Sequence, residues 1–488
     1  TLDTADFDYS LIPQEGLFAY GDILIQTGDL DRVRLIMESI EEPVFKLLLQ
    51  ARLKSVEGDP RGALEDYEEA FRSWSSNAGA RYLAAEAALK LGDFDVAMNH
   101  YMDALRADAP ATDAGIILAR LQFYQGLVRP AFDTVIFYLQ NAPEGRDRMV
   151  AVTMLNHLSM DTHSKEGAEF AREMMMQMGD PYAVGQAKAG YALALAKIDG
   201  DEAALAYLEE EDELLEAPTS AQALLVWSRL KKRLGQAEEA RARLERAMVE
   251  APDSFELKVA LANFDADDPE RAEEVDALFL EAIAQDSDYL PSHVGRIDFL
   301  KGQEGREEEI LEAWDEAARI DSKDPAFGYE AAMVLMNSGR TEEGLERLEA
   351  HLDLFPWYGD SAMELAASRN SMDDFSAESL RLARLAKSFG FRDRYRSWLL
   401  LGQIHMGRDE AEEAENILVQ AIQLDPNAPE GHYHLGLALD RQGRQAAAAA
   451  SFKRALALGE WTEMEDAQAR VSAYESSSPV SQNGTETE

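Results

Sequence analysis

The stretch that decides the fold is YRSWLLLGQIHMGRDEAEEAENILVQAIQLDPNA at residues 395–428, which is followed at once by PEGHYHLGLALDRQGRQAAAAASFKRALALGEWT at residues 429–462. Small and large apolar residues recur at matching offsets in both segments. The paired positions are Leu401 and Leu435, Gly402 and Gly436, Ala414 and Ala448, Leu418 and Phe452, and Ala421 and Ala455. Each pair is about 34 residues apart, the length of one helix–turn–helix unit. Because a small residue midway along each helix lets the other helix approach, each segment predicts one helical hairpin.

The same pattern extends upstream. Three units fill residues 44–145 without a break in register, and Gly58, Gly92 and Gly126 mark their turns, because glycine adopts a positive φ without steric cost. The period and the alternation of small and large residues closely resemble the tetratricopeptide repeat over almost the whole chain. The resemblance implies an all-α fold, a right-handed α-solenoid (superhelix) of about thirteen tandem helix–turn–helix repeats, in which each unit packs only on its neighbours.

The register of the repeats divides the chain into segments. We expect an irregular acidic lead-in at 1–13, N-terminal repeat units at 14–145, degenerate helical hairpins at 146–220, C-terminal repeat units at 221–462, a capping helix at 463–475 and a disordered tail at 476–488. The signature positions drift within 146–220, where an acidic run at 209–213 and a methionine cluster at 174–178 also lie. This segment is therefore the predicted hinge of the array, and core filling is the favoured interpretation of its methionines.

Composition excludes several classes of function. The net charge is −45, from 92 acidic and 47 basic residues, which argues against binding to nucleic acid or to an anionic membrane surface. The chain has no cysteine, so disulfides, thiolate metal sites and a cysteine nucleophile are excluded. No apolar run approaches the length of a membrane span. We expect no direct membrane insertion, and the sequence leaves the oligomeric state open.

The compartment is predicted from weaker signals. The chain begins at Thr1 without an initiator methionine, from which we expect that a signal sequence, a lipoprotein leader or an expression tag has been removed. The bacterial character of the sequence and the absence of cysteine favour the periplasm or an envelope-associated location. The cytoplasm is the alternative.

A search for catalytic chemistry finds little. The chain has no phosphate-cradling glycine loop and no serine in a nucleophile-elbow context. His432 and His434 are two residues apart and therefore point to different sides of a helix. The acidic run at 265–268 lacks the central glycine and the spaced glutamate of a calcium loop. We expect that the protein is not an enzyme and that it has no metal or cofactor site.

The expected first helices carry a distinctive set of side chains. The resemblance implies that these helices line a concave face that contacts the ligand, and basic residues outnumber acidic ones there, although the chain as a whole is acidic. Arginine with aromatic residues is typical of a recognition surface. The predicted partner-binding residues are Arg52, Lys90, Arg120, Tyr124, Arg229, Lys232, Arg233, Phe299, Tyr329, Arg396, Tyr433 and Arg441. The alternative is that the rings pack between helices and the arginines only neutralise acidic neighbours.

These features predict a non-catalytic scaffold that holds a peptide segment or a partner domain in its groove, with an acidic or extended segment as the expected ligand. Among the basic residues, Arg229, Lys232 and Arg233 form the densest cluster within about one helical turn. The paired lysines and asparagines of the carboxylate-clamp subfamily are missing, so a role beside chaperones is not expected. A bacterial envelope assembly or polymer-export complex is the favoured setting. A cytoplasmic adaptor, or the repeat region of a larger enzyme or secretion protein, is the alternative.

Overall fold

The computed structural model describes residue 9 and residues 12–142, 148–178, 181–210, 221–301 and 303–477. Within these residues the regular structure is α-helical with short 3₁₀ turns, and 27 α-helices form thirteen hairpins and one last helix. Contacts divide the chain into two compact units, Thr1–Phe123 with Leu127–Lys323, and Tyr124–Gly126 with Asp324–Glu488. The expected all-α solenoid of about thirteen hairpins is confirmed.

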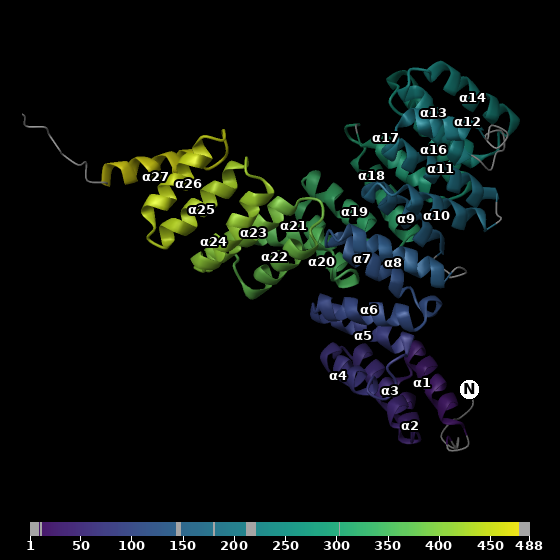
Figure 1. The fold of residues 1–488 in the computed structure, drawn as a ribbon, viewed down its shortest axis with the longest axis horizontal. Coiled ribbons are helices and arrows are strands. Elements are labelled where there is room, and N and C mark those ends of the chain that lie inside the picture. The colour runs from purple at the N-terminus through teal and green to yellow at the C-terminus, as the bar shows by residue number, and fades with distance from the viewer. Residues whose placement is uncertain are drawn as a thin grey trace, which may run out of the picture. The chain divides into compact units, whose positions relative to one another are not determined.

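The first unit contains eighteen helices in nine hairpins (Figure 1). They are α1 (Gln14–Thr27), α2 (Leu30–Glu38), α3 (Pro43–Val56), α4 (Pro60–Ala70), α5 (Ala78–Leu91), α6 (Phe94–Ala107), α7 (Ala114–Tyr124), α8 (Val128–Asn141), α9 (Arg148–Thr162), α10 (Lys165–Met176), α11 (Pro181–Ile198), α12 (Asp201–Glu210), α13 (Ala221–Arg233), α14 (Ala237–Glu250), α15 (Phe255–Asp265), α16 (Ala272–Gln285), α17 (Leu290–Leu300) and α18 (Glu307–Ile320).

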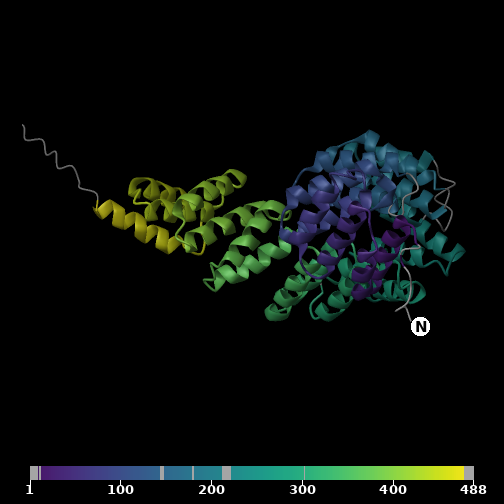
Figure 2. The same ribbon diagram turned by 90° about the horizontal axis from the view of Figure 1, so that it is seen from below.

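The second unit contains four hairpins and a last helix, and Figures 1 and 2 show α24 to α27 stacked in chain order. The helices are α19 (Pro325–Asn337), α20 (Thr341–Leu354), α21 (Gly359–Ser371), α22 (Ala377–Phe389), α23 (Arg394–Gly407), α24 (Ala411–Leu424), α25 (Pro429–Arg441), α26 (Gln445–Leu456) and α27 (Met464–Ser477). The last helix covers the open end of the stack, where Ala467 and Val471 are buried in a cluster with Phe452 of α26.

Local sequence explains where these helices begin and end. At the start of α19, Pro325 takes the first helical position and the Asp324 side chain accepts a hydrogen bond from the backbone N–H of Ala326, a favourable arrangement at a helix N-terminus. The hairpin turns use positive φ, as at Gly339 (85°). Asp409 takes the same place between α23 and α24 with a φ of 61°, a conformation that aspartate tolerates better than most residues.

The two small positions quoted from the repeat pair lie where the helices of a hairpin touch. A Cβ atom on Gly402 would lie 2.6 Å from Leu418 Cδ2, and one on Gly436 would lie 2.6 Å from Phe452 Cε1. Real Cβ atoms do not approach carbon atoms so closely, so any larger residue must displace its neighbour. The glycines are therefore required for packing.

The predicted hinge, 146–220, corresponds to α9–α12 in its described part. Met174 and Met175 are buried, whereas Met176 and Met178 are 42% and 37% exposed, so the cluster is divided between core and surface. Asn156 is buried on α9, and its Oδ1 atom has no hydrogen-bond partner among the described residues. An unpaired buried polar atom costs about 1–3 kcal/mol, which lowers the stability of this part of the array.

Three expectations fall wholly or partly outside the described residues. Most of the lead-in at 1–13, the acidic residues at 211–213 and the tail at 478–488 are among the residues left undescribed. Helix α27 runs to Ser477, two residues into the segment that was expected to be disordered. No helix in the described ranges is long and apolar enough to cross a membrane.

The first test concerns packing inside a hairpin. We expect Gly436→Leu to lower the free energy of unfolding by about 1–3 kcal/mol, because the new side chain enters the space of the Phe452 ring. Gly79→Leu is the matched control, since the nearest atom to a Cβ there is Asn77 Oδ1 at 3.7 Å. Urea unfolding followed by circular dichroism measures both. Loss of most of the helical signal in the folded Gly436→Leu protein would contradict an array of locally packed units.

The second test concerns the hinge. Amide hydrogen exchange should be faster in α9–α11 than in α23–α26, because the first segment combines drifting repeat positions with an unsatisfied buried amide oxygen. Exchange rates report local opening free energies. Equal protection of the two segments would disprove a hinge at 146–220.

Candidate functional site

Two of the three predicted basic residues of the N-terminal repeats, Arg52 and Arg120, have partners within the first unit. Arg52 of α3 forms an ion pair with Asp22 of α1, and burial lowers the pKa of its guanidinium group. Arg120 of α7 donates a hydrogen bond to the backbone oxygen of Lys323. Lys90 is exposed near the end of α5, and its charge opposes the rise in the pKa of Glu86 that burial causes.

The predicted basic cluster of α13 consists of Arg229, Lys232 and Arg233, and each of these residues contacts a different part of the neighbouring helices and turns. Arg229 Nη2 donates to Asn263 Oδ1 of α15 at 3.2 Å. Lys232 Nζ donates to the backbone oxygen of Phe264 at 2.8 Å and also pairs with an aspartate in the following turn, Asp267. Arg233 pairs with Asp201, the first residue of α12, at 2.6 Å. Each cation therefore links α13 to a different place on the neighbouring helices and turns, and the role of the three residues in partner binding stays a prediction.

The two predicted arginines of the second unit are held in the same way. Arg396 of α23 forms two parallel hydrogen bonds with Glu364 of α21, at 2.7 Å and 3.1 Å. The arginine side chain is 45% exposed and the glutamate 8% exposed. Arg441 Nη1 lies 2.8 Å from Asp409 Oδ1 and also donates to the backbone oxygen of Met406.

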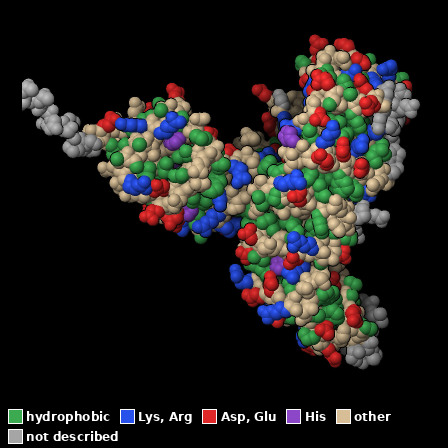
Figure 3. All heavy atoms as spheres, in the orientation of Figure 1, with side chains coloured by type: hydrophobic (Ala, Val, Ile, Leu, Met, Phe, Trp, Pro, Cys, Tyr) green, Lys and Arg blue, Asp and Glu red, His purple; other side chains and the backbone are tan. Residues whose placement is uncertain are grey.

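These pairs follow the repeat. The partners of Arg396 and of Arg441 each stand 32 residues away, and the partner of Arg229 stands 34 residues away. One period carries a side chain to the equivalent place on the next hairpin, so the basic residues brace successive repeats. Figure 3 shows basic and acidic side chains interspersed on the face in view. The contacts thus agree with neutralisation of acidic neighbours, and they leave Arg396 partly exposed.

The predicted aromatic residues are packed between helices. Phe299, Tyr329 and Tyr433 are all buried. The Tyr433 hydroxyl donates to Asp466 at 2.9 Å, and burial raises the pKa of Tyr433 to about 12. Tyr124, which belongs to the second unit, has its ring 5.3 Å from that of Trp357. These rings contribute to the core more than to an open surface.

Two features of the first helices of the second unit, and of the loop before α23, were not predicted. Arg392, in the loop before α23, pairs with Glu330 at 2.5 Å, and its backbone N–H donates to the buried Asp360. Burial raises the pKa of Asp360. Arg392 lies in a loop, outside the first helices that were predicted to contact the ligand. The signal that was available is the pair of acidic residues Asp360 and Glu364 on α21, which demand a cation nearby.

The second feature is a row of hydrogen bonds across three first helices. Asn370 Nδ2 of α21 donates to Gln403 Oε1 of α23 at 3.3 Å, and Gln403 Nε2 lies 2.8 Å from His434 Nε2 of α25. Burial lowers the pKa of His434 to about 4, so the ring is neutral at pH 7 and its Nε2 atom accepts the bond from Gln403. His432 instead contacts the backbone oxygen of Pro426, so the two histidines point apart as predicted.

The chemistry of this face is that of hydrogen bonding and charge pairing. Among the residues with assigned positions, no group of three or more histidine, aspartate or glutamate side chains is arranged to hold a metal ion. What the face offers a ligand is the exposed side of an arginine and a row of side-chain amides.

The fold and this face define an all-α solenoid whose helical hairpins are braced from one repeat to the next. The tetratricopeptide repeat family model matches residues 48–112 and 399–460. Residues 48–112 and 399–460 are therefore tetratricopeptide repeats, and the helical hairpins described between and around them fit further repeats of the same kind. Such repeats typically form non-catalytic interaction scaffolds, and the described hairpins are consistent with that class.

The solved structures that are similar to this chain share little sequence identity with it. The yeast Tom70 structure is 15% identical, with 89% of this chain and 96% of that chain covered and a TM-score of 0.35. The Cut9 chain of the APC/C Cut9–Hcn1 hetero-tetramer is 16% identical over 95% and 90% of the two chains, with a TM-score of 0.35. MamA from Desulfovibrio magneticus RS-1 is 23% identical over 38% and 97%, with a TM-score of 0.30. Likeness at this level says nothing about function. No curated protein sequence matches the chain.

The neutral histidine gives a pH test. Since the pKa of His434 is about 4 in the folded chain against 6.5 for the free side chain, the unfolded state takes up the proton first. Stability should therefore fall as pH drops below 6.5, by about 1.4 kcal/mol per pH unit at most. We expect His434→Gln to lose less stability than the wild type between pH 7 and pH 5 (about 1–2 kcal/mol less) in urea unfolding. His432→Gln is the control, and equal pH dependence in all three proteins would contradict a desolvated, neutral His434.

Proposed function

We propose that this protein is a non-catalytic scaffold that holds an extended, acidic segment of a partner protein against the first helices of its second unit. The observation that carries the proposal is the state of Arg396. Its guanidinium group is fixed by two hydrogen bonds to the nearly buried Glu364, yet its side chain is 45% exposed. Guanidinium has five N–H donors, so donors remain for a ligand carboxylate, and little side-chain entropy is lost when it binds.

The neighbouring amides favour an extended segment. Gln403 lies on α23, the helix that bears Arg396, and Asn370 lies on the neighbouring α21. Both present side-chain amide groups, which match the donors and acceptors of a peptide backbone. Because these residues recur at nearly one repeat, an extended chain crossing the helices meets them in succession. Tyr329, Tyr433 and Arg441 of the second unit pack or brace its repeats, so we assign them a supporting role in presenting this face.

For the setting, we propose a bacterial envelope assembly or polymer-export complex. The absence of cysteine supports it, because an unpaired thiol is a liability in an oxidising compartment. Fractionation of cells with periplasmic and cytoplasmic marker proteins tests the location. Recovery with the cytoplasmic marker would favour the adaptor alternative, and the complete reading frame decides whether these repeats belong to a larger enzyme or secretion protein.

The test of the binding face uses Arg396→Lys. Lysine keeps the charge beside Glu364 but loses the planar fork, so the fold should stay intact. We expect recovery of the cross-linked partner from cells to fall at least tenfold, because charge-assisted hydrogen bonds contribute about 1.5–3 kcal/mol. Partners are identified by mass spectrometry after affinity purification.

The matched control is Arg454→Lys on α26, an exposed second-helix arginine with no ion-pair partner among the described residues. It should leave recovery unchanged. Equal recovery from both variants, or equal loss, would refute a site at Arg396.

A further inference from the structure

The second unit contains a recess on the side of α23 that faces away from the proposed binding face. Trp398, Leu401 and His405 of α23 line it, and their spacing of three and four residues places them on one side of a helix. Gln403 and His405 are two residues apart, or about 200° around the helix axis. The recess is therefore separate from the row formed by Gln403.

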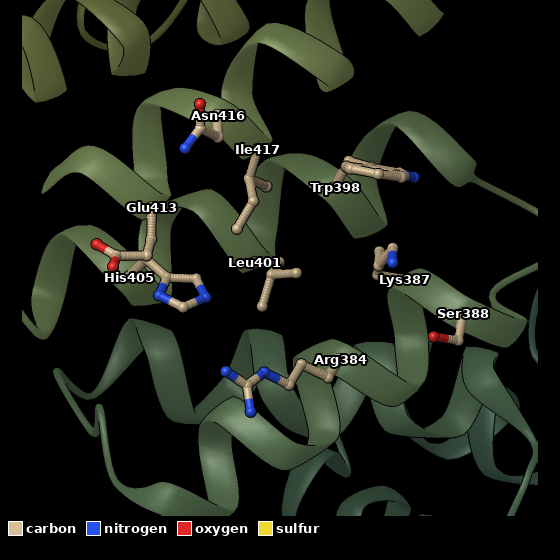
Figure 4. Close-up of a pocket in the computed structure, with 9 residues that line it drawn as sticks. All are labelled: Arg384, Lys387, Ser388, Trp398, Leu401, His405, Glu413, Asn416 and Ile417. Atoms are coloured by element: carbon tan, nitrogen blue, oxygen red, sulfur yellow. The ribbon is translucent and has the colours of Figure 1, made fainter. Parts of the chain in front are cut away.

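Three successive helices build the recess, which encloses about 480 Å³ and is open to the surface. Helix α22 contributes Arg384, Lys387 and Ser388, and α24 contributes Glu413, Asn416 and Ile417 (Figure 4). Leu401 is buried in its floor. Figure 4 shows the guanidinium group of Arg384 directed into the space beneath Leu401 and His405.

The cations of the recess differ from most others in the chain. Arg384 has no hydrogen-bond or ion-pair partner among the described residues, and the recorded contact of the Lys387 Nζ atom is the Trp398 ring, 4.9 Å from its centroid. Arg381, one turn earlier on α22, is by contrast held by Glu378 at 2.8 Å and 2.9 Å. In a chain with 92 acidic and 47 basic residues, Arg384 and Lys387 are distinctive because both lack an acidic partner among the described residues and both line the same recess.

The acidic and imidazole groups nearby do not neutralise them. His405 Nδ1 is paired with Glu410 at 2.6 Å. The carboxylate of Glu413 lies at the edge of the recess and points away from Arg384 (Figure 4). The centre of the recess is therefore positively charged above an apolar floor.

An equivalent recess in the first unit contains an arginine whose guanidinium group already contacts other side chains of the protein. It lies among α10, α11 and α12, encloses about 360 Å³, and includes Arg172, Glu173 and Tyr207 in its lining. There the Arg172 guanidinium group stacks over the rings of Tyr191 and Tyr207, at 4.9 Å and 5.9 Å from their centroids. The same place in the repeat thus holds Arg172, which stacks on two tyrosine rings, in the first unit, and Arg384, which has no hydrogen-bond or ion-pair partner among the described residues, in the second unit.

We propose that the recess among α22, α23 and α24 is a second binding site, for an acidic peptide segment of a partner protein. A glutamate or aspartate of the ligand pairs with the planar fork of Arg384, and Lys387 adds a second charge. An adjacent leucine, isoleucine or phenylalanine covers Trp398 and the apolar floor. The volume suits two or three residues, and the open side lets the segment continue over the surface.

The experiment uses a phage-displayed library of random decapeptides selected on the full chain and on Arg384→Gln. Peptides enriched by the wild type and lost on the variant should carry aspartate or glutamate next to a large apolar residue. A synthetic copy of the most enriched peptide should bind at least tenfold more weakly to Arg384→Gln in fluorescence anisotropy. Its glutamine-for-glutamate analogue should bind the wild type at least tenfold more weakly.

Two controls locate the site. Arg381→Gln changes an arginine one turn away on the same helix and should leave peptide affinity unchanged. Arg396→Lys alters the other face of α23 and should also leave peptide affinity unchanged. The experiment therefore tests the recess independently of the proposed site at Arg396. Identical selections on wild type and Arg384→Gln, an unaffected affinity in Arg384→Gln, or an equal loss in Arg381→Gln would overturn the proposal.

Discussion

The structure depends on the close approach of two helices inside each hairpin. At Gly402 and Gly436 even a Cβ atom would enter the space of Leu418 or Phe452, and alanine at 414 and 448 is fully buried on the opposing helix. Close approach at one point fixes how the hairpin helices cross, and repetition of the same point fixes how the next hairpin stacks. The inter-repeat contacts therefore recur at nearly one period, as the 32-residue spacings of the Arg396 and Arg441 pairs show.

The same repetition determines what the charges do. Acidic residues outnumber basic ones about two to one, and the cations Arg396 and Arg441 each lie 32 residues away from a carboxylate of the preceding hairpin. Arg396 and Glu364 illustrate the result, in which a partly exposed arginine holds a nearly buried acid. Truncating such an arginine leaves an unpaired buried charge, which costs more than the pair itself contributes. An arginine such as Arg396 is thus first a structural brace, and recognition uses the N–H donors that the brace leaves unpaired.

The fold could be predicted from the sequence because its determinants are local and repeated. The alternation of glycine, alanine and large apolar residues recurs so often that the register follows from reading along the chain. The site could not be predicted to the same extent. Arg384 and Arg396 are indistinguishable by residue type, and the difference between them is that Glu364 lies opposite only one of them. That partner is 32 residues away in sequence, so it becomes visible only when the hairpins are placed in space. The polar row through Gln403 was hidden for the same reason.

Helix α23 contributes to both faces that we consider for binding. Arg396 and Gln403 lie on the side that meets α21 and α25, whereas Trp398 and His405 line the recess with α22 and α24. Because a helix is rigid over this length, a ligand on one side need not displace anything on the other, and distant contacts of this kind add nearly independently. When one partner carries a segment for each site, binding of the first segment raises the effective local concentration of the second, so the overall affinity exceeds that of either site alone. A repeat array gains affinity in this way without a deep pocket, which suits a molecule whose interior is filled by its own packing.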